Sequence, residues 1–354
     1  MTLEGWGWTD EWRARLEALS VEAPCEPARV IGQDRDRWSI GTRASGAVSA
    51  RVASGRLDSY PVVGDWVVAC PGPTASDPWS LVAVLPRRTA FARAAAGTGA
   101  AAQVLAANVD RVWIVHGLDV PPNLRRLERY LALAWESGAA PSVVLTKADL
   151  ADDLAGCVAE VSRIAIGIPV HSVSTEDVES VRALRATLAP GETVVLLGPS
   201  GAGKSTLLNL LAEASVSATG AVRPSDRKGR HTTTRRALFQ LEGGALVLDT
   251  PGLRELRVWD LDEGLDRAFP DIEQLARGCR FRDCRHEREP ECAVLAAVAA
   301  GDLDSDRLAS FRKLRAEAAH EARKADPRAR AAALAEHKTA LKTLKHHLKF
   351  RGPE

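Results

Sequence analysis

The sequence predicts a multidomain α/β protein in which a small N-terminal β-barrel precedes a mostly parallel sheet and a C-terminal helical region. Three observations carry this prediction. Short segments rich in β-forming residues lie between residues 28 and 86, strands and helices alternate from about residue 103, and cysteines crowd between residues 279 and 292. At 354 residues the chain is long enough for two or three domains, each with its own core.

The composition is that of an ordinary soluble globular protein, with 45% apolar and 26% charged residues. No apolar run approaches the roughly 20 residues needed to span a bilayer. The N-terminus, Met1 to Trp6, lacks a basic region followed by an apolar stretch, so no secretory signal is visible. We therefore expect a cytoplasmic protein with no membrane partner, and a monomer as the default.

The N-terminal region is predicted from short strands separated by clusters of Gly, Asp, Ser and Pro. Their ranges are 29–31, 37–40, 47–52, 65–68 and 80–85. Five such strands favour a small barrel or sandwich, and the five-stranded OB barrel is the natural candidate. An Ala/Gly-rich stretch from Ala92 to Ala102 then reads as a linker.

The central region alternates apolar strands with helical segments. The strands are expected at 111–115, 142–145, 169–170 and 193–197, and the helices at 124–135, 154–164 and 205–214. This alternation implies a parallel sheet with helices on both faces. Two further strands, 237–241 and 245–248, are joined by Gly243-Gly244 and are predicted as a hairpin at the sheet edge.

A phosphate loop, Gly198-Pro-Ser-Gly-Ala-Gly-Lys-Ser205, follows one of these strands and opens a helix. Its glycines let backbone N–H groups turn toward phosphate oxygens, and the helix N-terminus adds positive potential. Lys204 is expected to reach the β- and γ-phosphates, and Ser205 to ligate Mg²⁺. The residues expected to bind the phosphates are Gly198, Pro199, Ser200, Gly201, Ala202, Gly203, Lys204, Ser205 and Thr206.

A second nucleotide element, Asp249-Thr-Pro-Gly252, comes after the phosphate loop. Asp249 ends an apolar strand, where its carboxylate can hold Mg²⁺ through water, and the Gly252 amide is placed to sense the γ-phosphate. Leu253 follows Gly252, so the glutamine that orients water in Ras-like enzymes is absent and intrinsic hydrolysis should be slow.

The segment Gly229-Arg-His-Thr-Thr-Thr234 stands between the helix and the hairpin, where the first switch of a GTPase should lie. One of its threonines is expected to complete the Mg²⁺ shell, and Thr233 is the candidate. His231 is the candidate to supply the missing water-orienting function. The alternative is a disordered basic loop.

The element that should read the base, Thr146-Lys-Ala-Asp149, precedes the phosphate loop by about fifty residues. Asp149 can accept hydrogen bonds from guanine N1–H and the exocyclic amine, whereas adenine offers no matching pair of donors. Lys147 can lay its stem along the base, Ala148 completes the turn, and Ser172 and Ser174 fit the last base-side loop. Such an element normally follows the phosphate loop, so the order predicts a circularly permuted GTPase.

The six cysteines do not form a disulfide pattern. Cys25, Cys70 and Cys157 are isolated. The others crowd into Cys279-x4-Cys284-x-His286-x5-Cys292, which offers three thiolates and an imidazole for tetrahedral Zn²⁺. Four protein ligands leave no open position, so we expect one structural zinc; reduced free thiols are the alternative.

The C-terminal tail is basic although the whole chain is nearly neutral. Residues 306–354 hold 13 Lys/Arg against 6 Asp/Glu, while the net charge of the chain is +1. Such a tail suits a polyanionic partner, and it also fits a solvated amphipathic helix.

Together these motifs resemble the bacterial ribosome small-subunit-dependent GTPase A family. The resemblance also includes Tyr60-Pro-Val-Val-Gly-Asp-Trp66 and Ala107-Asn-Val-Asp110. It implies an OB domain at 1–92, a permuted GTPase domain at 93–258 and a zinc domain with a basic helical tail at 259–354. It further implies GTP hydrolysis stimulated by the 30S subunit, contacts with 16S rRNA and a role in late 30S maturation. GTP would favour binding, and hydrolysis to GDP would favour release.

Three other functions remain open. The phosphate loop also resembles that of ABC-type ATPases, but no Leu-Ser-Gly-Gly-Gln signature follows and Asp249 is not followed by Glu. The chain could be a GTP-regulated RNA-binding switch with negligible turnover. It could also be a permuted GTPase of the large subunit, although the barrel and the cysteine cluster argue against this.

Overall fold

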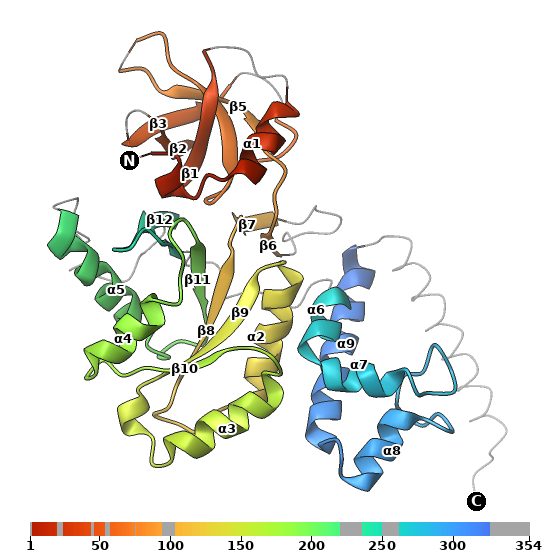
Figure 1. Ribbon diagram of the computed structural model, residues 1–354. Helices are drawn as coiled ribbons and strands as arrows, with labels where there is room; N and C mark the ends of the chain where they lie inside the picture. The colour runs from red at the N-terminus through yellow and green to blue at the C-terminus, as the bar shows by residue number, and fades with distance from the viewer. Residues whose placement is uncertain are drawn as a thin grey trace, which may run out of the picture.

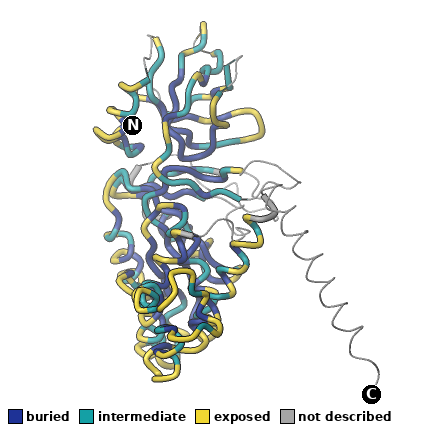
Figure 2. Tube along the Cα trace, turned by 90° about the vertical axis from the view of Figure 1, so that its right-hand side faces the viewer, coloured by how far each residue is buried: buried dark blue, intermediate teal, exposed yellow. Residues whose placement is uncertain are grey.

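The computed structural model describes residues 2–19, 24–43, 46–53, 57–74, 76–93, 103–219, 236–249 and 262–325. A β-barrel lies above a sheet flanked by helices, and a helical lobe lies beside that sheet (Figure 1). Buried residues concentrate in the barrel and the sheet, and exposed residues lie at the loops and outer helix faces (Figure 2).

The predicted N-terminal barrel is present and closed. Its strands are β1 (Glu26–Asp34), β2 (Arg37–Thr42), β3 (Gly46–Val52), β4 (Trp66–Cys70) and β5 (Trp79–Val84). They follow the order β1-β2-β3-β5-β4, and β4 pairs back onto β1. Closure satisfies the backbone groups that an open sheet would leave unpaired at its edges.

A short N-terminal segment that was not predicted from the sequence packs against the barrel. It consists of η1 (Glu4–Trp6) and α1 (Asp10–Glu17). Trp8 and Trp12 are buried, and the Trp8 ring lies edge-on to Trp66 of β4 with 4.7 Å between ring centroids. This segment therefore belongs to the hydrophobic core.

The central sheet has the predicted parallel strands. In spatial order they are β10 (Val170–Ser172), β9 (Ala140–Thr146), β8 (Arg111–Gly117), β11 (Thr193–Leu197) and β13 (Leu246–Asp249), followed by antiparallel β12 (Arg236–Gln240). Strand β8 pairs with β9 on one side and with β11 on the other.

Helices cover both faces of this sheet, as predicted. They are α2 (Leu124–Glu136) and α3 (Leu154–Ile164) on one face, and α4 (Val178–Arg185) and α5 (Lys204–Thr219) on the other (Figure 1). Successive residues of β8 point to opposite faces. Val112 and Ile114 join the core beneath α2 and α3, whereas Trp113 and Val115 join the core beneath α4 and α5.

The β12–β13 hairpin does not lie at a sheet edge, so that part of the prediction was wrong. Strand β12 pairs antiparallel with β1 of the barrel through Gly32↔Ala237 and Gln33↔Arg236. The barrel thus covers the edge that the hairpin would otherwise expose, and the two sheets run into each other.

The stretch from Ala92 to Ala102 was predicted as a linker, but its first residue lies in a strand. Ala92 lies in β6 (Ala90–Arg93), which pairs antiparallel with β7 (Gln103–Ala107). Residues 94–102 lie outside the described part of the chain. The barrel therefore leads into the central domain through a paired strand.

Arg29 holds the barrel to the central domain from a fully buried position. Its guanidinium donates to the carbonyl oxygens of Trp6 and Asn108, each at 3.0 Å, and to Thr193 Oγ1 at 3.2 Å. Burial lowers the pKa of Arg29 to about 10, which leaves it cationic at neutral pH. One side chain thereby joins the N-terminal segment, the start of the central domain and β11.

The C-terminal lobe contains α6 (Asp262–Ala268), α7 (Pro270–Ala276), α8 (Ala293–Ala300) and α9 (Ser305–Ala325). It packs closely on α2, because a Cβ at Gly264 would lie 2.4 Å from the Ala132 carbonyl oxygen. Arg307 of α9 is buried and donates to Glu128 of α2 at 3.1 Å and to Asp271 of α7 at 2.7 Å. Removing one member of such a buried ion pair is strongly destabilising, because the partner charge is left buried and uncompensated.

No helix among the described residues is both long and apolar enough to cross a membrane. Residues 326–354, which make up most of the basic tail, lie outside the described residues.

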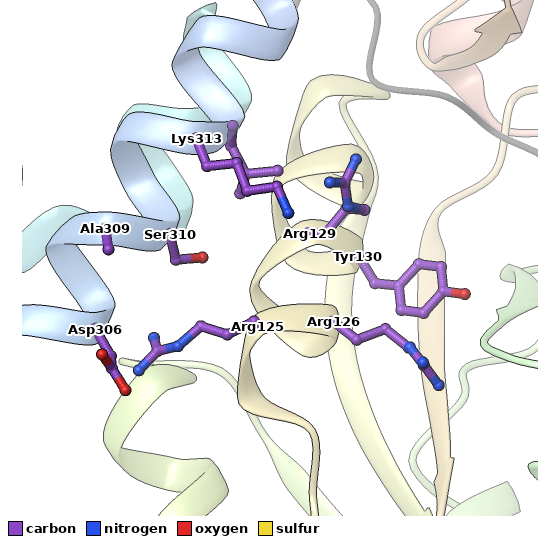
Figure 3. A pocket seen from close by; sticks show the side chains of 9 residues that line it. Arg125, Arg126, Arg129, Tyr130, Asp306, Ala309, Ser310 and Lys313 are labelled. Carbon is purple, nitrogen blue, oxygen red and sulfur yellow. The ribbon is translucent and has the colours of Figure 1, made fainter.

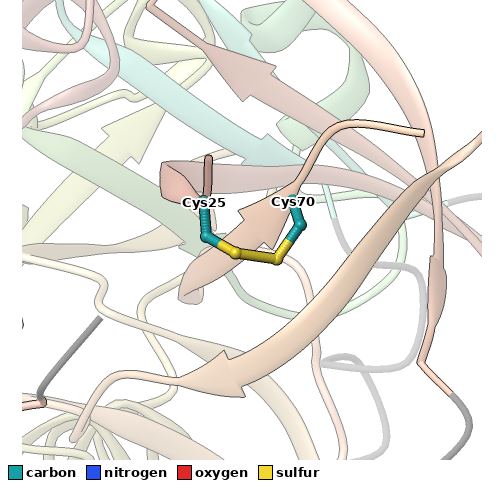
Figure 4. The surroundings of a disulfide bond; sticks show 2 residues. All are labelled: Cys25 and Cys70. Atoms are coloured by element: carbon teal, nitrogen blue, oxygen red, sulfur yellow. A yellow bond between two sulfur atoms is a disulfide. The ribbon is translucent and has the colours of Figure 1, made fainter. Parts of the chain in front are cut away.

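Two cysteines that the sequence analysis treated as isolated are joined. Cys25 and Cys70 form a disulfide (Figure 4). The antiparallel register Glu26↔Ala69 places the residue before Glu26 opposite the residue after Ala69. Sequence spacing could not reveal this pairing because it follows from barrel closure across 45 residues.

We predict that Cys70→Ser lowers the free energy of unfolding by about 2–4 kcal/mol, because the disulfide restricts the unfolded chain. Chemical denaturation with and without a thiol reductant measures this. Reductant should destabilise the wild type to the level of the variant and leave the variant unchanged. Equal stability of the oxidised wild type and Cys70→Ser would contradict the prediction.

Candidate functional site

The phosphate loop lies at the carboxyl edge of the sheet, between β11 and α5. Gly198 and Gly203 have φ values of 148° and 84°. A Cβ at Gly198 would lie 2.2 Å from the Val115 carbonyl oxygen of β8, which no side chain could tolerate. The glycines therefore allow the loop to fold closely over the neighbouring strand.

The lysine of this loop is buried and held by the loop itself. Lys204 Nζ donates to the carbonyl oxygen of Gly198 at 2.7 Å and also to that of Pro199. Ser205 and Thr206 follow in the first turn of α5 and are exposed. The amine is thus positioned within the loop, and both hydroxyl residues are accessible to a ligand.

Thr146 joins the predicted base-reading element to the phosphate loop. Its hydroxyl lies 2.6 Å from the Ala202 carbonyl oxygen and 3.2 Å from that of His116. Thr146 is 5% exposed, so these hydrogen bonds form away from water. The structure therefore brings together two motifs that the chain encodes in the unusual order.

Asp149 and Ser174 also meet, as two elements of one base-side site should. The Ser174 hydroxyl donates to the Asp149 carboxylate. The Ala148 N–H donates to the Val173 carbonyl oxygen at 3.2 Å and fixes the two loops against each other. Ser172 is exposed in β10, and in the described chain no side-chain hydrogen bond ties it to this cluster.

The sequence analysis missed Asp119, which pairs with Lys147. The Lys147 Nζ and Asp119 Oδ2 lie 2.7 Å apart, and this hydrogen bond lowers the pKa of Asp119. A Cβ at Gly117 would lie 2.7 Å from Asp119 Oδ1, so glycine leaves room for the carboxylate that holds Lys147. The sequence does place an acid just after the strand at 111–115. Because adjacent parallel strands end at the same edge of a sheet, this acid could have been expected near the residues that follow the next strand.

Asp249 ends β13, whose partner β11 leads into the phosphate loop. Its half-buried side chain therefore lies at the same sheet edge as the loop. Three other candidates, His231, Thr233 and Gly252, lie outside the described residues.

The predicted metal ligands Cys279, Cys284, His286 and Cys292 converge in the C-terminal lobe. Their ligand atoms all lie within 4.8 Å of one another. The Cys279 and Cys292 sulfurs are 3.8 Å apart, and they lie 3.6 and 3.5 Å from His286 Nδ1. Tetrahedral coordination with Zn–S and Zn–N bonds of ordinary length requires edges of about 3.8 and 3.6 Å. The residues thus fit a tetrahedral ion.

The protein shapes this cluster through neighbouring backbone groups. Burial raises the pKa of Cys279, but hydrogen bonds from the backbone N–H groups of Val294 and Ala293 and from the Cys292 and Cys284 side chains together lower it. Burial lowers the pKa of His286, which favours the neutral imidazole that a metal requires. The Glu289 carboxylate accepts three backbone N–H groups at 2.8–3.0 Å and so braces the loop between the ligands.

The chain is similar in sequence to known proteins. The family model "RsgA GTPase" matches residues 84–259. The "Small ribosomal subunit biogenesis GTPase RsgA" of Opitutus terrae is 46% identical over 342 residues, which cover 92% of each chain. The protein of the same name from Streptomyces coelicolor is also 46% identical and covers 95% of this chain and 92% of its own.

Two solved structures share the fold. YjeQ from Thermotoga maritima superposes with a TM-score of 0.63 at 25% identity, covering 82% of this chain and 97% of its own. YloQ, described as a circularly permuted GTPase, gives a TM-score of 0.61 at 23% identity, covering 84% and 96%. The permuted order inferred from the motifs therefore has a structural counterpart.

We predict that the purified chain holds one metal ion at the four-residue cluster and that Cys284→Ser loses most of it, because one of four ligands is removed. Elemental analysis after dialysis measures the ion. Nucleotide affinity should not change, since the cluster lies in a separate lobe. Cys157→Ser removes a free thiol of α3 as a control and should keep the metal; full metal retention in Cys284→Ser would rule out the assignment.

Proposed function

Because this chain belongs to the RsgA GTPase family, we propose that it is a GTP hydrolase that binds the 30S ribosomal subunit and assists its late maturation. GTP favours binding to the subunit, and hydrolysis favours release. The observation that supports this best is the hydrogen bond from the Thr146 hydroxyl to the Ala202 carbonyl oxygen. It joins a base-reading element to a phosphate loop that comes later in the sequence.

The guanine side of the site is assigned from the geometry of its loops. Asp149 accepts hydrogen bonds from guanine N1–H and the exocyclic amine, and Ser174 holds the carboxylate in place. Lys147 lies along the base and is positioned by Asp119. The proposed GTP-binding residues are Thr146, Lys147, Ala148, Asp149, Ser172, Ser174, the loop from Gly198 through Thr206, and Gly252.

The phosphate side is assigned to Lys204, whose cation would stabilise charge on the β- and γ-phosphates during transfer. Ser205, Thr233 and Asp249 would hold Mg²⁺, which supplies charge neutralisation to the same phosphates. His231 would orient the attacking water, since Leu253 stands where Ras-like enzymes carry glutamine. Unchanged 30S-stimulated turnover in His231→Ala would exclude that role.

We further propose that the ion of the cysteine cluster is a single structural Zn²⁺. Three thiolates and one imidazole are a ligand set that Zn²⁺ favours, and four protein ligands leave no position for a substrate. The ion would stabilise a loop that Glu289 braces from within.

The RNA partner would be 16S rRNA, contacted by the barrel, the zinc lobe and the basic tail through salt-sensitive phosphate contacts. The proposed domain limits are 1–92, 93–258 and 259–354. The chain would act as a monomer in the cytoplasm.

The experiment is GTP turnover by the full-length chain alone, with 30S subunits, with 50S subunits, and with ATP as competitor. We expect slow basal turnover and stimulation by 30S alone of roughly 10²-fold or more, the factor that a positioned catalytic group contributes. ATP should not compete. Affinity for 30S should be higher with a non-hydrolysable GTP analogue than with GDP.

Each failure would have a distinct meaning. Stimulation by 50S and not by 30S would point to a large-subunit GTPase. Negligible turnover with intact 30S binding would indicate a GTP-regulated RNA-binding switch, and competition by ATP would indicate an ATPase.

A further inference from the structure

A hollow of about 600 Å³ crosses the exposed face of α2 and reaches α9 (Figure 3). Arg125 and Arg129 of α2 are four residues apart and lie on its α9 side, whereas Arg126 and Tyr130 point toward the other side of α2. Lys313 reaches across from α9. The hollow is thus lined by cations from two domains that the nucleotide site does not use.

Two of these cations are already neutralised. Arg125 lies 2.7 Å from Glu128 and 3.6 Å from Asp304. Arg129 makes two hydrogen bonds to the Glu317 carboxylate, at 2.7 and 2.9 Å. Asp306 is the acid of the α9 wall, and it lies at the Arg125 end (Figure 3).

The other two cations are available. Arg126 and Lys313 are exposed, and neither forms an ion pair with any residue that the structure describes. Lys313 reaches toward α2 from α9, where Ser310 also stands, whereas Arg126 and Tyr130 lie on the far side of α2 (Figure 3). Two cations that are separated in this way and form no ion pair match successive anionic groups of an extended ligand.

We propose that this hollow, together with Arg126 and Lys313, binds the sugar–phosphate backbone of RNA; this rests on the 30S-binding function proposed above. Small-molecule sites are mostly apolar, whereas charged and hydroxyl side chains make up most of the lining of this hollow. Contacts to nucleic acid go largely to phosphates, and Arg, Lys, Ser and Tyr make them. Arginine matches phosphate geometry with its planar fork, and lysine supplies a point charge.

The domain contact beneath the hollow sets the spacing of its walls. Glu128 pairs with Arg125 in the hollow and with the buried Arg307 of α9. Arg307 also pairs with Asp271 of α7. An RNA strand across the hollow would therefore contact the GTPase domain and the zinc lobe at once, in a fixed relative position.

The test compares the full-length wild type with the double variant Arg126→Gln/Lys313→Gln. The control is Arg163→Gln/Arg182→Gln, which removes two positive charges from exposed positions of α3 and α4, where Arg182 pairs with Glu179 of its own helix. Affinity is measured across a salt series for 30S subunits with a non-hydrolysable GTP analogue, and separately for fluorescein-labelled oligouridylate. All variants should melt at the wild-type temperature because the changed side chains are exposed.

We expect the hollow variant to bind both RNAs more weakly. The slope of log affinity against log salt should be shallower by about 1.4–1.8, because two phosphate contacts are lost. The control should match the wild type. Wild-type affinity and slope in the hollow variant, or an equal loss in the control, would overturn the proposal.

Two further outcomes separate the hypotheses. Displacement of oligouridylate by millimolar inorganic phosphate in the wild type but not in the hollow variant would make this a small-anion site and overturn the RNA assignment. If the wild type binds oligouridylate more tightly than the hollow variant but does not bind 30S subunits, the RNA site is supported and the proposed 30S function is refuted. If the wild type and the hollow variant bind 30S subunits equally well, the RNA site in the hollow is refuted and the proposed function stands.

Discussion

The position of β8 at the centre of the sheet is the constraint on which the nucleotide site depends. β8 pairs with β9 on one side and β11 on the other, so the strands that lead into the base-reading element and the phosphate loop end at one edge. The Thr146 hydroxyl then reaches the Ala202 carbonyl oxygen across 56 residues of chain. Spatial neighbourhood in a parallel sheet is independent of sequence order, which is why a permuted chain can assemble an ordinary site.

Much of this could be predicted from the sequence because its signals are local. The strand preceding Gly198, the glycine spacing of the loop and the thiolate spacing of Cys279 to Cys292 each specify short-range geometry. The helices at 124–136 and 154–164 were confirmed nearly to the residue. Both helices begin at a residue whose side chain accepts a backbone N–H of the first turn, Asn123 in one and Asp153 in the other, and such caps are local signals.

The parts that could not be predicted depend on contacts between distant segments. The pairing of β12 with β1, the Cys25–Cys70 bond and the buried Arg29 are all set by how the barrel sits on the sheet. Arg29 reads as an ordinary surface residue in sequence, yet it hydrogen-bonds three separate segments. The Asp119–Lys147 pair likewise requires that β8 and β9 lie side by side, which the acid after the strand at 111–115 signals only indirectly.

The central claim is that Asp149, encoded before the phosphate loop, reads the base. The most direct measurement is the affinity of the wild type and Asp149→Asn for GTP, ATP and xanthosine triphosphate. The wild type should favour GTP over ATP by roughly 10⁴-fold, since adenine has no pair of donors for the Asp149 carboxylate and would leave it unpaired against the base. Asp149→Asn should lose GTP and gain xanthosine triphosphate, whose C2 carbonyl accepts from an amide. Equal wild-type binding of ATP and GTP, or unchanged GTP affinity in the variant, would contradict the account.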